Sequence, residues 1–212
     1  YKELEKDFKL FKMLSMKPKF NIVFNTVTME CDLTKIDMNI LVNKYRELFK
    51  EVISTEKHHY EYLFLNRVKF IYNKQIESMV CFYGDCRNKW ISVHQDGNIY
   101  PCGQEWRQKN DNYLLGNIHE NTFYEAFNCD NYKIFSDKIQ SKRDWCRLNC
   151  NIYEFCHSGC PGEDFSNNGD VGTINEESCL YEKEMINMIN EELKTNKIIN
   201  ESILNIIGDC NE

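Results

Sequence analysis

Apolar residues in the first eighty positions recur with helical spacing in some stretches and in strand-like runs in others. Residues 1–14 place apolar side chains three and four positions apart, which predicts a helix. Residues 19–29, rich in β-branched and aromatic residues, predict a buried strand. Residues 37–53 again have helical spacing, with Asp37 available as N-cap, and residues 60–72 form a second apolar, strand-like run. Strand and helix therefore alternate, as in βα units with a parallel sheet.

The hydrophobic pattern changes after residue 80. Residues 89–102 alternate in polarity and turn at Asp96-Gly97, a dipeptide that tolerates positive φ, which predicts a short antiparallel hairpin ending at a cysteine. Residues 121–139 predict an amphipathic helix or helix pair, and residues 180–196 a helix whose apolar side chains pack. We expect three parts with the boundaries 1–80, 81–182 and 183–212.

Composition narrows the possible partners. The 212 residues are 42% hydrophobic, enough for a real core, and the net charge is −7 from 26 basic and 33 acidic residues. No basic run is dense enough to follow a phosphate backbone, so we do not expect nucleic acid as a partner. We also expect no membrane segment and a cytoplasmic location, because no signal-peptide core and no window of roughly 18 apolar residues is present.

Cysteine is the most informative residue type. There are eleven, ten of them from Cys81 onward, and the stretch DWCRLNCNIYEFCHSGCPG at 144–162 holds four. An odd count without a secretory signal argues against a disulfide framework, and clustered reduced thiols usually bind metal. If a CxxxC pair makes a helical turn, its thiols at i and i+4 face the same way. Two centres of four thiolates are the simplest arrangement. The wide spacing and the Cys-Pro favour iron–sulfur clusters, with zinc as the alternative.

The order and spacing of seven cysteines and one glycine resemble a known family. Cys86, ten residues, Gly97, four residues and Cys102 are followed by the 146-to-160 run and then by Cys179. This resembles the SPASM domain, the C-terminal extension of many radical S-adenosylmethionine enzymes that modify peptides and proteins, over residues 81 to about 182. One departure is that three residues separate the first pair of the run, where the family usually has two.

The resemblance implies two auxiliary [4Fe–4S] clusters and their ligands. The implied ligands of the first are Cys86, Cys102, Cys160 and, as fourth, Cys81, although some relatives leave that iron open for substrate. The implied ligands of the second are Cys146, Cys150, Cys156 and Cys179. Zinc at these thiols stays possible by residue type alone.

The resemblance extends to the first eighty residues, which are similar to the late βα units of a partial radical S-adenosylmethionine barrel. The expected fold class is therefore α/β plus α+β. No CxxxCxxC motif is present, so we expect the C-terminal portion of a longer enzyme, unable to cleave S-adenosylmethionine alone. That cofactor and a third [4Fe–4S] cluster are expected only in the full-length protein. The implied partners are a peptide or protein substrate and an electron donor such as ferredoxin or flavodoxin.

Several residues near the cysteines have plainer interpretations. Cys31, Cys129 and Cys210 fit no ligand pattern and are expected to be small buried hydrophobes. His94 and His157 are expected to be surface or hydrogen-bonding residues rather than ligands.

Two arginines and four aromatic residues also have ordinary structural interpretations. Arg143 and Arg147 flank the first CxxxC; they either raise the potential of a nearby cluster or form ordinary surface salt bridges, and the sequence leaves both possible. Four aromatic residues are expected in the core rather than in a peptide groove: Trp106, Phe123, Tyr124 and Phe127.

Gly103 bears on the substrate. It follows Cys102 where anaerobic sulfatase maturases, a SPASM subgroup, have an aspartate implicated as a base. The resemblance therefore favours a maturase of ribosomally made peptides that forms thioether or carbon–carbon crosslinks. The alternatives are a non-catalytic peptide-recognition or electron-relay module and a structural zinc module.

Overall fold

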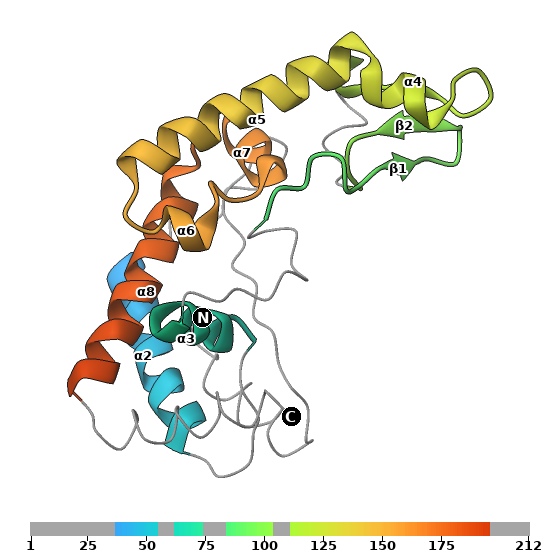
Figure 1. Cartoon of the computed structure of the whole chain (residues 1–212). Coiled ribbons are helices and arrows are strands. Elements are labelled where there is room, and N and C mark those ends of the chain that lie inside the picture. Colours follow the sequence, from blue (N-terminus) through green and yellow to red (C-terminus); the bar gives the residue numbers. More distant parts are fainter. Residues whose placement is uncertain (1–36, 55–61, 74–83, 104–110, 196–212) are drawn as a thin grey trace. The chain divides into compact units, whose positions relative to one another are not determined.

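The computed structural model describes residues 37–54, 62–73, 84–103 and 111–195 (Figure 1). The predicted helix at 1–14 and strand at 19–29 lie outside the described residues, as do Cys31, Cys81, Trp106 and Cys210. The chain divides into two compact units. Of the described residues, 37–54, 62–73 and 177–195 belong to the first unit, and 84–103 and 111–176 to the second. The described fold is helical with one small antiparallel sheet, an α+β arrangement; the three-part division at residues 80 and 182 stays a prediction.

Helix α2, Met38–Ser54, confirms the predicted helix and its cap. The Asp37 carboxylate accepts the N–H groups of Asn39 at 3.0 Å and Ile40 at 3.2 Å, which satisfies two amides that have no partner within the helix. Ile40, expected on the apolar face, is exposed. The other apolar positions of the predicted face are buried: Leu41, Tyr45, Leu48 and Phe49.

The strand predicted at 60–72 is wrong, because Tyr62–Asn73 form helix α3. A short apolar run cannot be assigned to strand or helix by periodicity alone, and its β-branched and aromatic residues follow the packing of the site. Val68 and Phe70 are buried, and so are Asn66 and Arg67. The βα alternation inferred for this part of the chain therefore rests on residues 19–29, outside the described residues.

Helix α8, Glu176–Thr195, confirms the predicted C-terminal helix. Met185, Met188, Ile189 and Leu193 are buried as expected, whereas Leu180 is exposed.

Ion pairs connect the three helices of the first unit. Arg67 on α3 donates from Nε to Glu182 Oε2 at 3.1 Å and from Nη2 to Oε1 at 3.0 Å, and both side chains are almost fully buried. Arg46 on α2 donates to Glu192 at 2.8 Å and to Glu191 at 2.9 Å. The unit thus combines apolar helix faces with a buried two-point ion pair.

The predicted hairpin is present in the second unit. Strand β1, Ser92–Val93, pairs antiparallel with β2, Asn98–Tyr100, and β2 pairs antiparallel with β3, Gly116–Asn117. Gly97 in the turn has φ +84°, and a Cβ there would lie 2.6 Å from Asn117 Oδ1, so the turn requires glycine. Cys102 follows β2 by two residues, at the base of the hairpin.

The predicted helix pair is also present, with one helix longer than expected. It consists of α4, Phe123–Asn128, and α5, Asp130–Asn149, which continues ten residues past the predicted end at 139. Thr122 and Glu125 form a capping box at the start of α4. Cys129 is not a bare buried hydrophobe: its Sγ accepts the Tyr132 N–H at 3.4 Å and caps α5, while the side chain packs against the core. Figure 1 shows α4 beside the hairpin at one end of α5, and α6 and α7 along the rest of it.

The core of the second unit joins the sheet to α5, α7 (Pro161–Asn168) and the short 3-10 helix Asp111–Tyr113. Its buried members are Ile99, Tyr113, Leu115, Ala126, Tyr132, Phe135, Ile139, Phe165 and Val171. Phe127 packs against it as expected, but the expectation for Phe123 and Tyr124 is wrong: they are 53% and 78% exposed. Helix α4 turns Ala126 and Phe127 inward, which leaves its first two residues facing water.

No helix in the described part of the chain is long and apolar enough to cross a membrane.

Candidate metal centre

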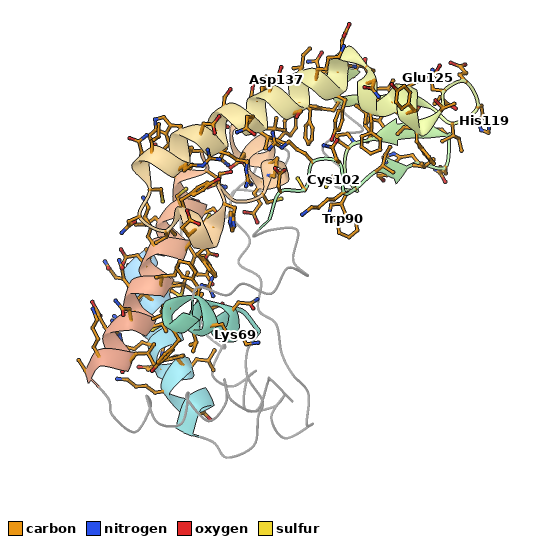
Figure 2. The ribbon with its side chains drawn as sticks, viewed as in Figure 1. Lys69, Trp90, Cys102, His119, Glu125 and Asp137 are labelled. Carbon is orange, nitrogen blue, oxygen red and sulfur yellow. The ribbon has the colours of Figure 1, made fainter. Side chains whose placement is uncertain are left out.

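Three of the predicted ligands for the first cluster lie around one cavity. Cys86 precedes β1, Cys102 follows β2, and Cys160 is the N-cap of α7; all three line a cavity of about 370 Å³. Figure 2 shows Cys102 next to Trp90 at the base of the hairpin, away from His119 at its other end. Residues separated by up to 74 positions therefore bring three thiols to one place (160 minus 86).

The wall of this cavity is mainly apolar. Ile91, Phe135 and Pro161 line it, and Trp90, which is 54% exposed, stands at its edge. Burial raises the pKa of the Cys160 thiol to about 12, although the Glu163 and Gly162 N–H groups act in the opposite direction. A bare thiolate is therefore unstable at this site, and a positively charged group is needed to hold it in that form.

The first CxxxC pair forms a helical turn. Cys146 lies in the last turn of α5 and Cys150 caps the helix, with its N–H donating to the Cys146 carbonyl at 2.8 Å. The predicted one-turn geometry is confirmed for this pair. Cys146 is buried, and Cys150 is partly exposed.

The second CxxxC pair does not form a helical turn. Cys156 ends α6, Tyr153–Cys156, and is followed by three residues with positive φ: His157 at 48°, Ser158 at 75° and Gly159 at 74°. Pro161, suited to the first helical position, then starts α7 directly after Cys160. A left-handed turn thus connects Cys156 to Cys160, and their assignment to different clusters stays a prediction.

One face of α5 holds the loop that carries Cys86. The Tyr132 hydroxyl accepts the Asn88 N–H at 2.7 Å, and the Ser136 carbonyl accepts from Arg87 at 3.4 Å. Two further turns along, Arg143 Nε lies 3.9 Å from Asp85 Oδ2. Spacings of four and seven residues place these three α5 positions on one stripe of the helix.

A buried ion pair joins the same helix to α7. Lys142 on α5 pairs with Asp164 on α7, and both side chains are at least 95% buried. Burial raises the pKa of Asp164 to about 6, against the opposing effects of Lys142 and of the Asn175 N–H. Because Cys160 begins α7, this pair fixes the distance between α5 and the third thiol of the cavity.

The structure also describes the two histidines and the two arginines that flank the cysteines. His94 stacks on Tyr100 with ring centroids 4.7 Å apart, and His157 contacts the Tyr153 ring edge-on. Arg147 is 54% exposed and pairs with Asp144 at 3.2 Å, as expected for a surface salt bridge, whereas the Arg143 side chain is 11% exposed. Within the described ranges, no three His, Cys, Asp or Glu side chains lie close enough to share a single metal ion.

Two predicted ligands remain without a described relation to the others. Cys81 lies outside the described residues, and Cys179 lies on α8 in the first unit. Their membership of a metal site stays a prediction. Sequence reasoning also missed Asp85, Lys142 and Asp164, because no spacing rule connects a charged residue to a partner 22 to 58 positions away (164 minus 142; 143 minus 85).

Two sequence comparisons find proteins similar to this chain. A family model for the SPASM iron–sulfur cluster-binding domain matches residues 81–151. The chain is 38% identical over 80 residues to the cysteine-type anaerobic sulfatase-maturating enzyme of Clostridium novyi (strain NT), a match that covers 38% of this chain and 20% of that enzyme.

Solved structures show the same fold. Native anSMEcpe with bound AdoMet matches with a TM-score of 0.63 at 17% identity, over 95% of this chain and 53% of that one. Native anSMEcpe with bound AdoMet and the Cp18Cys peptide matches with a TM-score of 0.59 at 18% identity, over 95% and 54%. The chain spans about half the length of these structures. Residues 81–151 thus match the model of the SPASM iron–sulfur cluster-binding domain, and the chain resembles the C-terminal portion of a radical S-adenosylmethionine enzyme.

Proposed function

We propose that this chain is the C-terminal portion of a radical S-adenosylmethionine maturase and holds two auxiliary [4Fe–4S] clusters. The observation that carries the proposal is the convergence of Cys86, Cys102 and Cys160 on one cavity from three separate segments. The second support is the SPASM match at residues 81–151.

The donors at this cavity fit a cluster. A [4Fe–4S] cluster takes one thiolate at each iron, so its ligands stand around a cavity instead of meeting at a point. All three described donors are thiols, and Ile91, Phe135 and Pro161 give the cavity an apolar wall. The raised pKa of Cys160 fits the same interpretation, because iron supplies the positive charge that this thiolate lacks. Cys81 is the proposed fourth ligand.

The second cluster is assigned by resemblance and by the turn that separates the two groups of cysteines. Cys146 and Cys150 follow each other by one helical turn, and Cys156 is buried at the end of α6. With Cys179 they complete the proposed set of four.

In the maturase, auxiliary clusters supply sites that accept an electron or bind a substrate thiolate. The chain's own residues hold the thiols and fix their spacing through α5. S-adenosylmethionine and a third cluster belong to the rest of the proposed enzyme, and ferredoxin or flavodoxin is the proposed electron donor.

The proposed substrate is a peptide or protein. The name of the C. novyi relative describes an enzyme that matures sulfatases, which are proteins. One similar structure contains a bound peptide. Anaerobic sulfatase maturases have an aspartate where this chain has Gly103, which favours a ribosomally made peptide as the substrate. The C. novyi relative is itself a sulfatase-maturating enzyme, which favours a sulfatase. A sulfatase-derived peptide and a peptide encoded beside the gene are therefore the two substrates to assay.

Metal analysis of anaerobically prepared chain tests the cluster proposal. We expect about eight irons and eight sulfides per chain, because two four-iron clusters bind to eight thiolates. About two zinc ions without sulfide would establish the structural zinc module instead. Cys129→Ser is the matched control, since Cys129 caps α5 outside both proposed sets and its substitution leaves the iron content unchanged.

A further inference from the structure

Arg143 contacts both segments that carry proposed ligands. Its Nη1 donates to the His157 carbonyl at 3.0 Å, in the turn between Cys156 and Cys160. Its Nε lies 3.9 Å from Asp85 Oδ2, next to Cys86. The guanidinium also stands one helical turn before Cys146 on the same helix. One side chain thus lies beside ligands of both proposed clusters.

The turn that Arg143 contacts is conformationally costly. His157 and Ser158 have side chains and yet adopt φ of 48° and 75°, a left-handed conformation that a Cβ makes unfavourable. Backbone bonds from His157 N–H to the Tyr153 carbonyl at 2.8 Å and from Gly159 N–H to the Cys156 carbonyl at 2.9 Å hold the two ends. The His157 carbonyl between them is held by Arg143. A charged donor makes this bond stronger than a neutral one.

The contact near Cys86 is electrostatic. Asp85 accepts from Arg87 Nε at 2.9 Å and from Nη2 at 2.5 Å. Arg143 on α5 and Arg87 in the loop itself both approach the Asp85 carboxylate. Two guanidinium groups and one carboxylate leave a net positive charge beside the Cys86 loop.

We propose that Arg143 is a positioning residue that connects the Cys86 loop to the Cys156–Cys160 turn through α5, and that its charge raises the reduction potentials of both clusters. The inference deepens the proposed function and rests on it. A cationic donor near a cluster with four thiolates favours the reduced, more negative form. Arg143 has two effects that substitutions can separate, namely the geometry of its fork and its charge.

Arg147 provides a matched control. It lies on the same helix four residues later and flanks the same cysteine, but it is 54% exposed and pairs with Asp144. Its Nη2 also lies 3.5 Å from the Tyr153 hydroxyl at the start of α6, but its charge is more strongly screened by water than that of Arg143. Arg147→Gln is therefore expected to change exchange in the turn and both potentials less than Arg143→Gln does.

Four variants of the anaerobically loaded chain test the proposal: Arg143→Met, Arg143→Gln, Arg143→Lys and Arg147→Gln. Amide hydrogen exchange in residues 156–160 reports the geometry, and a reductive titration followed by electron paramagnetic resonance reports the potentials. We expect Arg143→Met to speed exchange in the turn about tenfold, because a charge-assisted bond is lost. Arg143→Lys keeps the positive charge and should retain the reduction potentials of both clusters, but it should not fully protect the amides of residues 156–160 from exchange. Arg143→Gln removes the charge and should lower both reduction potentials.

The outcomes distinguish this inference from the proposed function. Wild-type chain without iron and sulfide would overturn the proposed function and this inference with it. Clusters at the wild-type level, with potentials unchanged in Arg143→Gln, would overturn the inference alone. If Arg143→Met fails to fold, the Lys and Gln variants still decide it, because the potential depends on charge and not on stability.

Discussion

The two units of this chain are stabilised in different ways. The first consists of α2, α3 and α8, helices of 12 to 20 residues with buried apolar faces and the buried pair of Arg67 with Glu182. Apart from the 20-residue helix α5, the second has short elements, namely strands of two or three residues and a four-residue helix α6, and it holds seven of the eight described cysteines. Where short segments carry the thiols, bound metal commonly supplies part of the stability. We infer that the first unit folds by burial and the second depends on its thiol ligands.

Removing iron should separate the two units most strongly. We expect a chelator under reducing conditions to increase amide exchange in residues 84–103 and 150–165 by at least about a hundredfold, because ligand binding free energy is folding free energy in such sites. Exchange in α2 and α3 should change little, and exchange in α8 should rise only around Cys179, the proposed ligand on that helix. Equal loss of amide protection in both units would contradict the inference that the second unit depends more strongly on its thiol ligands.

Breaking the buried ion pair should affect the first unit instead. Arg67→Met leaves Glu182 charged and buried, which costs about 3–5 kcal/mol of the free energy of unfolding. Urea unfolding followed by exchange in α3 and α8 measures it. The double variant Arg67→Met with Glu182→Gln is the control and should recover part of the loss. The iron proposed for Cys86, Cys102 and Cys160, all in the second unit, should be unchanged, and its loss would show that this site depends on the first unit.

Two glycines in the second unit offer a smaller, paired comparison. Gly159 and Gly169 have φ of +74° and +75°, and a Cβ at either position meets nothing closer than 4.0 Å. Alanine should therefore cost each about 1–2 kcal/mol from backbone conformation alone. Gly159→Ala distorts the turn between two ligands and should reduce bound iron, whereas Gly169→Ala at the end of α7 should not. Equal iron contents would contradict a ligand-positioning role for the turn.

The smallest expected effect concerns Asp170 and Lys138. Burial alone would raise the pKa of Asp170, but hydrogen bonds from Lys138 and the Gly172 N–H lower it below its ordinary value of 3.8. The stabilisation is thus present at neutral pH and is lost as pH falls through the folded-state pKa. Lys138→Met should cost less than about 1 kcal/mol at pH 7, since both side chains are more than a third exposed. A nuclear magnetic resonance titration of the Asp170 carboxyl measures the pKa; an unchanged value in the variant would contradict the pairing.

Local signals in the sequence predicted several elements correctly. Asp37 before a helical pattern gave α2, Asp96-Gly97 gave the hairpin, and the apolar spacing after residue 180 gave α8. Residues 60–72 were assigned wrongly because β-branched and aromatic residues also fit a buried helix. The resemblance to the SPASM pattern implied that Cys86, Cys102 and Cys160 belong together, and all three line one cavity.

Long-range charge pairs could not be predicted in the same way. The buried pair of Lys142 with Asp164 and the contact of Arg143 with the His157 carbonyl depend on how α5, α7 and the left-handed turn pack. Tyr124 was assigned to the core because aromatic residues are often buried, yet it is 78% exposed. Sequence patterns thus identify the donors, while the elements that hold them in place emerge only from the fold.

Iron content of paired serine variants tests the central claim most directly. The account predicts that Cys102→Ser with Cys160→Ser, and separately Cys146→Ser with Cys156→Ser, each remove about four of about eight irons, and that all four substitutions together remove nearly all of them. Cys129→Ser should remove none. If both pairs eliminated the same irons, or if neither lowered the iron content, two separate thiolate-bound clusters in this chain would be contradicted.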